Sequence, residues 1–405
     1  MKGRHAPADF GWRLQGRPVQ VLQDRSWKLP ARRDALAAFL APYCGDAQTL
    51  QSCLQCGVCT ASCNLAREDS GFPRKQMALI QVGQLEAVMS DPDLWRCYNC
   101  SDCSTQCSSK ARPGQIMAGL RQVAVERYAP LPFLAHAMSS VRGLALVGLA
   151  SAILLLLTLA AGGSFHPQTT PVLYASMVPH RTLNLLFTFL AGASGLGAVI
   201  SVQRSWRAFS GRAWWQVRLR TLLPAGGEAL QEAVSHRNFR KCEQFPLAGL
   251  AHAAMMAGFF ALLIVAGAVA VRVLLGKPYP LSLGHPLKIA GNAAGLAMIV
   301  GAGYFAIQRW LRRRTERSTT FDWLLLANVL AVVATGMMVE GFRLANLAVL
   351  AYPTYFLHLV LAMGLIAGLP FTKFGHSVYR VVAMASQGYN ARIKEVLHEA
   401  QGNAA

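Results

Sequence analysis

Eight of the ten cysteines fall into two copies of one spacing, and closely spaced thiolates are typical ligands of soft metal centres. The two runs are Cys53-x2-Cys56-x2-Cys59-x3-Cys63 and Cys97-x2-Cys100-x2-Cys103-x3-Cys107. Gaps of two residues let three thiolates of a tight loop face three irons of a cube, while the fourth thiolate points toward the partner cluster. The spacing therefore predicts two [4Fe–4S] clusters and one-electron transfer.

The same rule predicts how the ligands are divided between the clusters. One cluster takes Cys53, Cys56, Cys59 and Cys107, and the other takes Cys97, Cys100, Cys103 and Cys63. A zinc site is disfavoured, because it usually uses two well-separated CxxC pairs. A disulfide framework is disfavoured, because the topology below predicts a cytoplasmic location. The remaining Cys44 and Cys242 are expected to be ordinary thiols.

Apolar runs long enough to cross a bilayer fill the second part of the chain, which is 53% hydrophobic overall. We count six, at about 141–162, 181–202, 247–275, 287–308, 323–341 and 354–372. The net charge is +20, and its arginines concentrate in alternate loops, 203–245 and 309–317, whereas 163–180 has no lysine or arginine. This positive-inside pattern predicts a multi-pass inner-membrane protein with both termini and the cysteine region in the cytoplasm. Because the charges adjoin the spans, they indicate contact with membrane lipid, and no nucleic-acid partner is expected.

The predicted fold is all-α, with a helical two-cluster ferredoxin domain followed by a six-helix transmembrane haem b bundle. We expect an N-terminal lead at 1–40, the cluster domain at 41–128, the membrane domain at 129–380 and a cytoplasmic tail at 381–405. Helices are expected at about 31–40, 74–89 and 114–128. The basic loop 203–245 suits either a helix on the lipid surface or a partner-docking face.

Histidines in or beside the spans are the second set of candidate ligands, because ionisable groups at membrane depth are costly and usually functional. His358 and His376 are 18 residues apart, or five turns, which predicts one face of a continuous sixth helix with about 27 Å between them. Each could then serve a different b haem. His252, near the cytoplasmic end of the third span, is the expected axial partner of His376.

The partner of His358 is less clearly indicated, so one or two haems b are expected. His358 needs a partner at similar depth, and His180 is favoured over His285 and His166. Helix capping is the alternative role for His180. His236, in the basic loop, is expected to be a surface residue. No catalytic residue is expected. Glu340 could exchange protons with a quinone, but an interfacial carboxylate is the favoured interpretation.

Two segments carry a family resemblance. HLVLAMGLIAGLPFTKFGH, from His358 to His376, resembles the last haem-binding helix of the respiratory nitrate reductase gamma family, where histidines at this separation ligate two different b haems. That family has two further ligands ten residues apart on an earlier helix. His252 matches the first, whereas Leu262 stands where the second would be.

The cysteine doublet resembles the C subunits of heterodisulfide reductases. Fusion of both modules, over roughly residues 41–380, resembles the C-subunit family of quinone-interacting membrane-bound oxidoreductase (Qmo) complexes. This implies cytoplasmic flavin and iron–sulfur partner subunits, and an oxidoreductase subunit that passes electrons between adenylylsulfate reductase and the quinone pool. Two alternatives stay open: a membrane subunit of a heterodisulfide or sulfite reductase-type complex, and a haem-free redox-sensing membrane protein.

Overall fold

A computed structural model describes residues 33–44, 48–67, 70–162, 167–241, 247–311 and 319–402. Within these ranges the chain is almost entirely helical, which confirms the predicted all-α class. A two-residue hairpin, β1 (Gln168–Thr169) with β2 (Val172–Leu173), is the one sheet in these ranges. The expectations for Cys242, for His166 and for most of the N-terminal lead lie outside the described residues.

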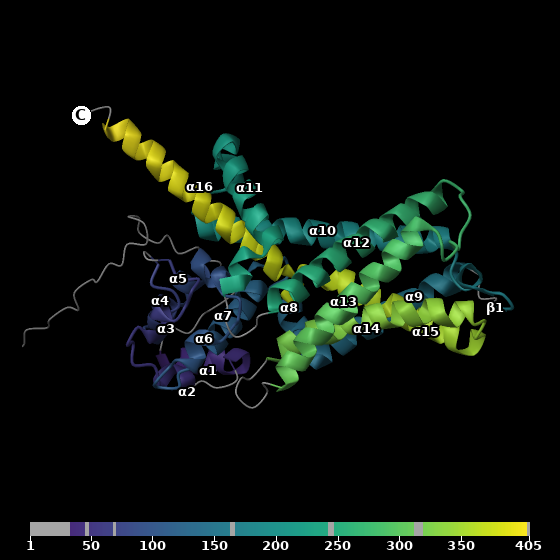
Figure 1. Cartoon of the computed structure of the whole chain (residues 1–405), viewed down its shortest axis with the longest axis horizontal. Helices are drawn as coiled ribbons and strands as arrows, with labels where there is room; N and C mark the ends of the chain where they lie inside the picture. Colours follow the sequence, from purple (N-terminus) through teal and green to yellow (C-terminus); the bar gives the residue numbers. More distant parts are fainter. Residues whose placement is uncertain are drawn as a thin grey trace, which may run out of the picture.

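The cysteine-rich half is built from short helices that lie together at one end of the molecule (Figure 1). Their bounds are α1 (Arg33–Cys44), α2 (Gln48–Gln51), α3 (Val58–Ala61), α4 (Arg74–Gln81), α5 (Leu85–Met89), η2 (Pro92–Arg96), α6 (Asp102–Thr105) and α7 (Pro113–Tyr128). The helix expected over 74–89 is interrupted at Gly83, whose φ of 81° is a conformation that glycine adopts readily. α8 (Pro132–Met138) leads into the membrane part.

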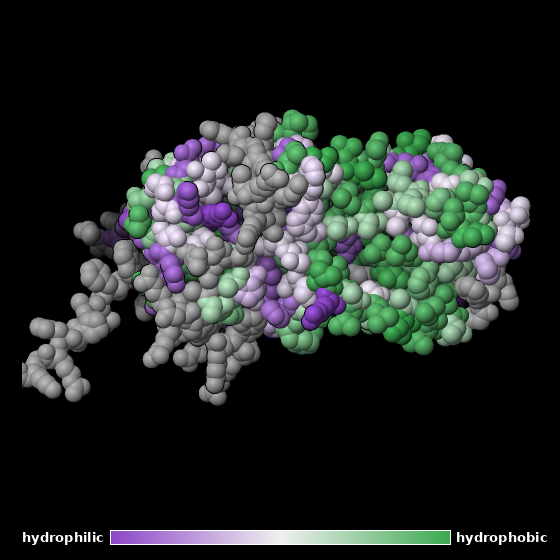
Figure 2. Space-filling view, turned by 90° about the horizontal axis from the view of Figure 1, so that it is seen from below, coloured by the Kyte–Doolittle hydropathy of each residue, from purple (hydrophilic) through white to green (hydrophobic). Residues whose placement is uncertain are grey.

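In the part of the chain that the structure describes, six helices are long and apolar enough to cross a membrane, as the sequence predicts. They are α9 (Val141–Gly162), α10 (His180–Ser210), α12 (Ala248–Leu274), α13 (Pro286–Leu311), α14 (Thr320–Leu344) and α15 (Ala348–Gly368). Figure 2 shows hydrophobic residues covering the half of the molecule that these helices form. Few of their side chains are buried in the protein, which is expected of helices that face lipid.

The remaining helices are α11 (Leu219–Ser235), α16 (His376–Gly402) and the short η3 (Tyr174–Ser176), η4 (Trp214–Gln216), η5 (Arg237–Lys241) and η6 (Lys373–Gly375). α11 packs against α16 through Ala225 and Ala229. Its opposite side exposes Leu219, Leu223, Leu230 and Val234. The face of α11 that points away from α16 is therefore apolar and exposed.

α12 and α13 approach each other very closely because small residues lie between them. A Cβ added at Gly301 would lie 2.6 Å from the Ala251 carbonyl oxygen, and one at Gly258 would lie 2.7 Å from that of Ala294. The backbones therefore touch at two levels of this helix pair.

The sixth span is not one continuous helix through His376, and this prediction was wrong. α15 ends at Gly368, and α16 begins at His376 after the short η6. Pro370 has no N–H to donate to the carbonyl four residues earlier, and its ring obstructs that carbonyl. Ser194 of α10 donates to this Ile366 carbonyl instead, at 2.7 Å. The five-turn spacing therefore does not put His358 and His376 on one helical face.

The segment expected as a tail after residue 380 belongs to α16, which packs on the cysteine-rich half. Tyr379 is fully buried, with its ring 4.9 Å from that of Trp95 and 5.8 Å from that of Tyr128. One hydrophobic core thus includes side chains of α1, α7, α10, α11 and α16.

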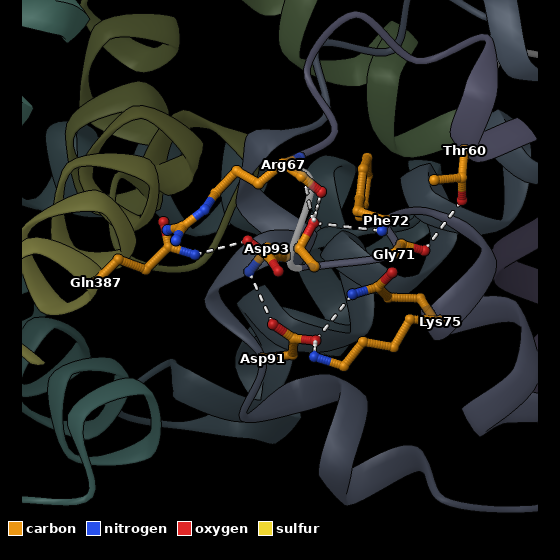
Figure 3. A network of polar contacts seen from close by, with 10 residues as sticks. Thr60, Arg67, Gly71, Phe72, Lys75, Asp91, Asp93 and Gln387 are labelled. Carbon is orange, nitrogen blue, oxygen red and sulfur yellow. Dashed lines mark hydrogen bonds and ion pairs between the residues drawn. The ribbon is translucent and has the colours of Figure 1, made fainter. Parts of the chain in front are cut away.

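A polar network strengthens the same contact (Figure 3). Gln387 of α16 donates to the Asp93 carboxylate at 2.7 Å, and the Asp93 backbone N–H donates to Asp91 at 3.0 Å. Lys75 completes the network with a 2.8 Å ion pair to Asp91. α16 therefore ties the segment between the two cysteine runs to the membrane helices.

Candidate functional site

The two cysteine runs fold in the same way. Gln55 and Asn99, at equivalent positions between the first two cysteines, have φ values of 56° and 58°. Gly57 and Ser101, directly after the second cysteine of each run, are also left-handed, and each caps a one-turn helix, α3 or α6. The repeated sequence is therefore a repeated loop structure.

The thiols of the two runs are interleaved. Burial raises the pKa of Cys59, and the neighbouring Cys53 and Cys107 thiolates raise it further. Burial also raises the pKa of Cys103, and there the neighbouring thiolates are Cys97, then Cys63 and Cys59. The fourth cysteine of each run is thus close enough to the third cysteine of the other run to influence its titration.

A small cavity lies among the thiols of the second group. Cys63 of the first run and Cys97, Cys100 and Cys103 of the second all line it, together with Leu65, Phe72, Pro73, Tyr98, Ser101, Asp102, Gly114 and Met117. A Cβ at Gly114 would lie 3.6 Å from Cys103 Sγ and 3.0 Å from Ser104 Oγ. Glycine at this position lets α7 begin beside the cavity without filling it.

Among the described residues, no three His, Cys, Asp or Glu side chains gather closely enough to hold one metal ion. A zinc ion draws four ligands around one point. Each thiolate of a cubic cluster binds a different iron, which keeps the sulfurs further apart.

Backbone donors point at two of the sulfurs. The Asn99 N–H donates to Cys97 Sγ at 3.3 Å, and the Ala111 N–H donates to Cys107 Sγ at 3.3 Å. Such bonds favour the reduced, more negative form of an iron–sulfur centre and raise its potential. By contrast, Cys56 is exposed, so the first group of thiols reaches the surface. Cys44 is outside both groups, and burial raises its pKa to about 12.

The structure brings His252 and His376 together where α12 and α16 begin, with ring centroids 6.0 Å apart. Two imidazoles on opposite sides of one metal have centroids about 6 Å apart, from two bonds of about 2 Å and roughly 1 Å within each ring. Two imidazoles at this separation could therefore hold one metal between them.

In both His252 and His376 the Nδ1 atom is engaged in a hydrogen bond, which leaves Nε2 available to a metal. His376 Nδ1 lies 2.6 Å from the Lys373 carbonyl oxygen and donates to it. Burial lowers the pKa of His376 well below its ordinary value, so this ring is neutral and Nε2 keeps its lone pair. The Ser377 hydroxyl lies 3.3 Å from that nitrogen and can rotate away from it. His252 Nδ1 lies 2.8 Å from His236 Nε2.

His236 is buried, so its predicted surface location was wrong. The chain returns after α11 and inserts this ring beside His252, with ring centroids 5.0 Å apart. A contact between a loop and a later helix has no periodic signature, so no sequence pattern indicated it.

The second cysteine run and the histidine pair share a contact. Tyr98, directly after Cys97, packs edge-on against Phe239 with centroids 4.3 Å apart, and the Phe239 ring lies 5.3 Å from that of His252. Arg380, one turn after His376, lies over the Tyr98 ring at 3.7 Å. It also donates to the Cys97 carbonyl at 2.8 Å. Sequence reasoning missed both Phe239 and Arg380.

A buried ion cluster holds the segment before His376. The Lys373 ammonium pairs with Asp322, which is 5% exposed and also pairs with Arg309 at 3.3 Å. Asp322 additionally caps the start of α14 with Thr319. The Lys373 backbone that accepts from His376 is thereby fixed to the membrane helices.

The other predicted ligands occupy separate places. His358 Nδ1 lies 3.0 Å from the Val332 carbonyl oxygen and 3.1 Å from Thr335 Oγ1, both on α14. His180 packs edge-on against Tyr279 with centroids 4.9 Å apart. In the described ranges no ring contact joins His180 to His358, so their pairing stays a prediction.

His285 and Glu340 have structural partners. His285 Nδ1 accepts from the Leu287 N–H at 3.2 Å, which caps α13. Glu340 forms a 2.7 Å ion pair with Lys288.

Comparisons with known proteins concern the cysteine-rich part. Residues 49–111 match a family model described as a 4Fe-4S dicluster domain. A heterodisulfide reductase C-subunit-like protein of Archaeoglobus profundus is 31% identical over 84 residues, which are 20% of this chain and 45% of that protein. The C subunit of the H(2):CoB-CoM heterodisulfide,ferredoxin reductase of Methanothermobacter marburgensis is 36% identical over 64 residues, 16% and 35% of the two chains. The C subunit of the ferredoxin:CoB-CoM heterodisulfide reductase of Methanosarcina acetivorans is 34% identical over 76 residues, 19% and 30%.

The matched region is less than half of each of these relatives, and no solved structure matches the chain. The chain therefore contains a 4Fe–4S dicluster-type region at residues 49–111 and is similar to heterodisulfide reductase C subunits over about a fifth of its length. The six apolar helices of the described residues are candidate membrane spans and suggest a multi-pass membrane protein.

Proposed function

We propose that the protein carries electrons between a cytoplasmic redox partner and the quinone pool, through two [4Fe–4S] clusters and one or two b haems. The observation that carries this proposal is the contact between the second cysteine run and the histidine pair. Tyr98 and Phe239 lie between Cys97 and His252, with ring separations of 4.3 and 5.3 Å. A soluble cluster and a membrane cofactor would be adjacent there.

The proposed cluster ligands are those that the spacing predicts. Cys53, Cys56 and Cys59 with Cys107 form one set, and Cys97, Cys100 and Cys103 with Cys63 form the other. The interleaved neighbours of Cys59 and Cys103 support this division. When bound, each cluster would take up and release single electrons. The exposed Cys56 suggests that the first set faces the soluble partner.

His252 and His376 are the proposed ligands of a haem b at the boundary between the two halves. Their centroid separation of 6.0 Å and the available Nε2 atoms fit two axial positions. A haem held there would change its charge by one electron at a time. The chain itself orients both imidazoles through hydrogen bonds at their Nδ1 atoms.

A second haem would use His358 at the opposite depth, with His180 as the proposed partner. The Val332 carbonyl holds His358 Nδ1, which leaves Nε2 available. Gly336 lies against the His358 ring. A Cβ at position 336 would be 3.1 Å from His358 Cε1, which is closer than an ordinary van der Waals contact.

The proposed setting is a quinone-linked oxidoreductase complex in the inner membrane, of the Qmo type, with flavin and iron–sulfur subunits on the cytoplasmic side and a link to adenylylsulfate reductase. The positive-inside charge pattern supports this orientation. The relatives are subunits of multi-subunit reductases by name, which supports soluble partner subunits.

A visible spectrum and EPR of the purified protein test the proposal. Dithionite reduction should give the bands of low-spin b haem beside iron–sulfur signals. His376→Ala should remove one haem and leave the iron–sulfur signals unchanged, whereas His398→Ala, at an exposed position in the same helix, should remove none. A wild-type protein without haem bands would exclude the conduit and favour the redox-sensing alternative.

The heterodisulfide reductase relatives favour one second candidate. The chain would then serve a heterodisulfide or sulfite reductase-type module with the same electron path. Affinity purification from native membranes distinguishes these settings by the soluble proteins that copurify.

A further inference from the structure

We propose that His236 positions His252 and sets the electron density on its ligating nitrogen. This inference rests on the proposed haem between His252 and His376. It assigns a role to a residue outside the predicted ligand set.

A chain of hydrogen bonds fixes the tautomers of both rings. His236 Nδ1 lies 2.8 Å from the Val234 carbonyl oxygen, which can only accept, so Nδ1 carries the proton. In the neutral form of the ring, His236 Nε2 is then an acceptor, and it lies 2.8 Å from His252 Nδ1. His252 Nδ1 must therefore donate, which leaves His252 Nε2 free to bind a metal.

Packing holds His236 in this orientation. The residue is 9% exposed, at the left-handed C-cap of α11, with φ of 53°. The Phe239 ring lies 6.1 Å from the His236 ring and 5.3 Å from the His252 ring. The geometry is therefore set by the end of α11 and the following turn, and not by a mobile surface side chain.

The bond has a chemical consequence for the ligand. An imidazole that donates its second N–H to an acceptor has a fixed ring plane and is a more basic ligand. A more basic ligand stabilises the oxidised, more positive iron and lowers the reduction potential. His376 has the matching bond to the Lys373 carbonyl, at 2.6 Å. Each proposed ligand therefore donates its Nδ1–H to an acceptor. The acceptor for His376 is a backbone carbonyl, and the acceptor for His252 is the neutral His236 ring.

The test compares three variants of the full-length protein in detergent. His236→Leu keeps much of the volume and removes the acceptor. His236→Gln retains an acceptor oxygen near the position of Nε2. Arg237→Ala changes the adjacent side chain, which is 64% exposed, and serves as the loop control. The readouts are EPR of the oxidised low-spin haem and its midpoint potential by redox titration, with the iron–sulfur signals as a measure of intact folding.

His236→Leu should raise the midpoint potential of one haem, by about 59 mV if the oxidised form loses tenfold in relative stability, and shift that haem's EPR signal. His236→Gln should restore most of the wild-type value, and Arg237→Ala should change neither readout. If the Leu variant loses this haem and the Gln variant retains it, that result also supports the positioning role of His236.

Two results would overturn the role of His236. One is an unchanged potential and EPR signal in the Leu variant. The other is an equal shift or loss in the Leu and Gln variants. Absence of haem from the wild type would instead refute the proposed function, so the two failures are distinguishable.

Discussion

Gly301→Ala tests whether backbone contact between α12 and α13 holds the histidine pair in place. A Cβ at this position would lie 2.6 Å from the Ala251 carbonyl oxygen and 2.7 Å from Met255 Cγ. A carbon and an oxygen atom in contact are usually about 3.3 Å apart, so the two helices must separate by roughly 0.7 Å. Such overpacking costs about 1–3 kcal/mol of unfolding free energy. This corresponds to a roughly 5- to 150-fold change in the unfolding equilibrium.

The effect should reach the proposed cofactor, because Ala251 directly precedes His252. We expect a lower melting temperature in detergent and a smaller or shifted b-haem band. Gly303→Ala is the matched control on the same helix, because a Cβ there meets nothing within 4 Å. Alanine is the better helix former by up to about 1 kcal/mol, so this variant should be as stable as the wild type or slightly more stable. Equal melting temperatures for both variants would refute the reasoning.

Three further outcomes are expected. Cys107→Ser should alter the EPR signal of the cluster held by the first run, and Cys63→Ser that of the other cluster; damage confined to the mutated run would contradict cross-ligation. Lys373→Met should destabilise the folded protein by about 3–5 kcal/mol, because Asp322 loses one of its two partners in a buried site. The double variant Lys373→Met with Asp322→Leu should recover part of this loss in the same melting assay. Cys44, whose pKa is raised to about 12, should resist alkylation at pH 8 in the folded protein and react after unfolding, as mass spectrometry can measure.

Features that depend on the local spacing of residues could be predicted from the sequence. Features that depend on contacts between segments far apart in the chain could not. The six spans follow from apolar length alone. The proximity of His252 and His376 follows from antiparallel helices with residues at similar depth. Pro370 signals the break before His376, but the spacing of the two histidines favours one continuous helix, and that prediction was wrong. His236 and Phe239 approach the pair from a loop, and long-range packing of that kind leaves no pattern in a single sequence.

The extent of α16 was missed for a related reason. Its residues after 380 are only partly apolar and have no span-like character, so they were interpreted as a tail. Gln387 in this segment bonds to Asp93, which lies almost 300 positions earlier in the chain. Tertiary contacts of this separation stabilise a helix that local sequence alone does not predict.

The interleaving of the two cysteine runs has a consequence for how the protein is assembled. If each run supplies the last ligand of the other run's cluster, neither run can complete the ligand set of its own cluster alone. Insertion of the first cluster would draw Cys107 or Cys63 into place and so preorganise the second loop. Incorporation of the two clusters should therefore be cooperative. A cell short of iron would then contain a mixture of protein molecules with both clusters and protein molecules with none. Removing one cluster by oxidation would, for the same reason, loosen the other.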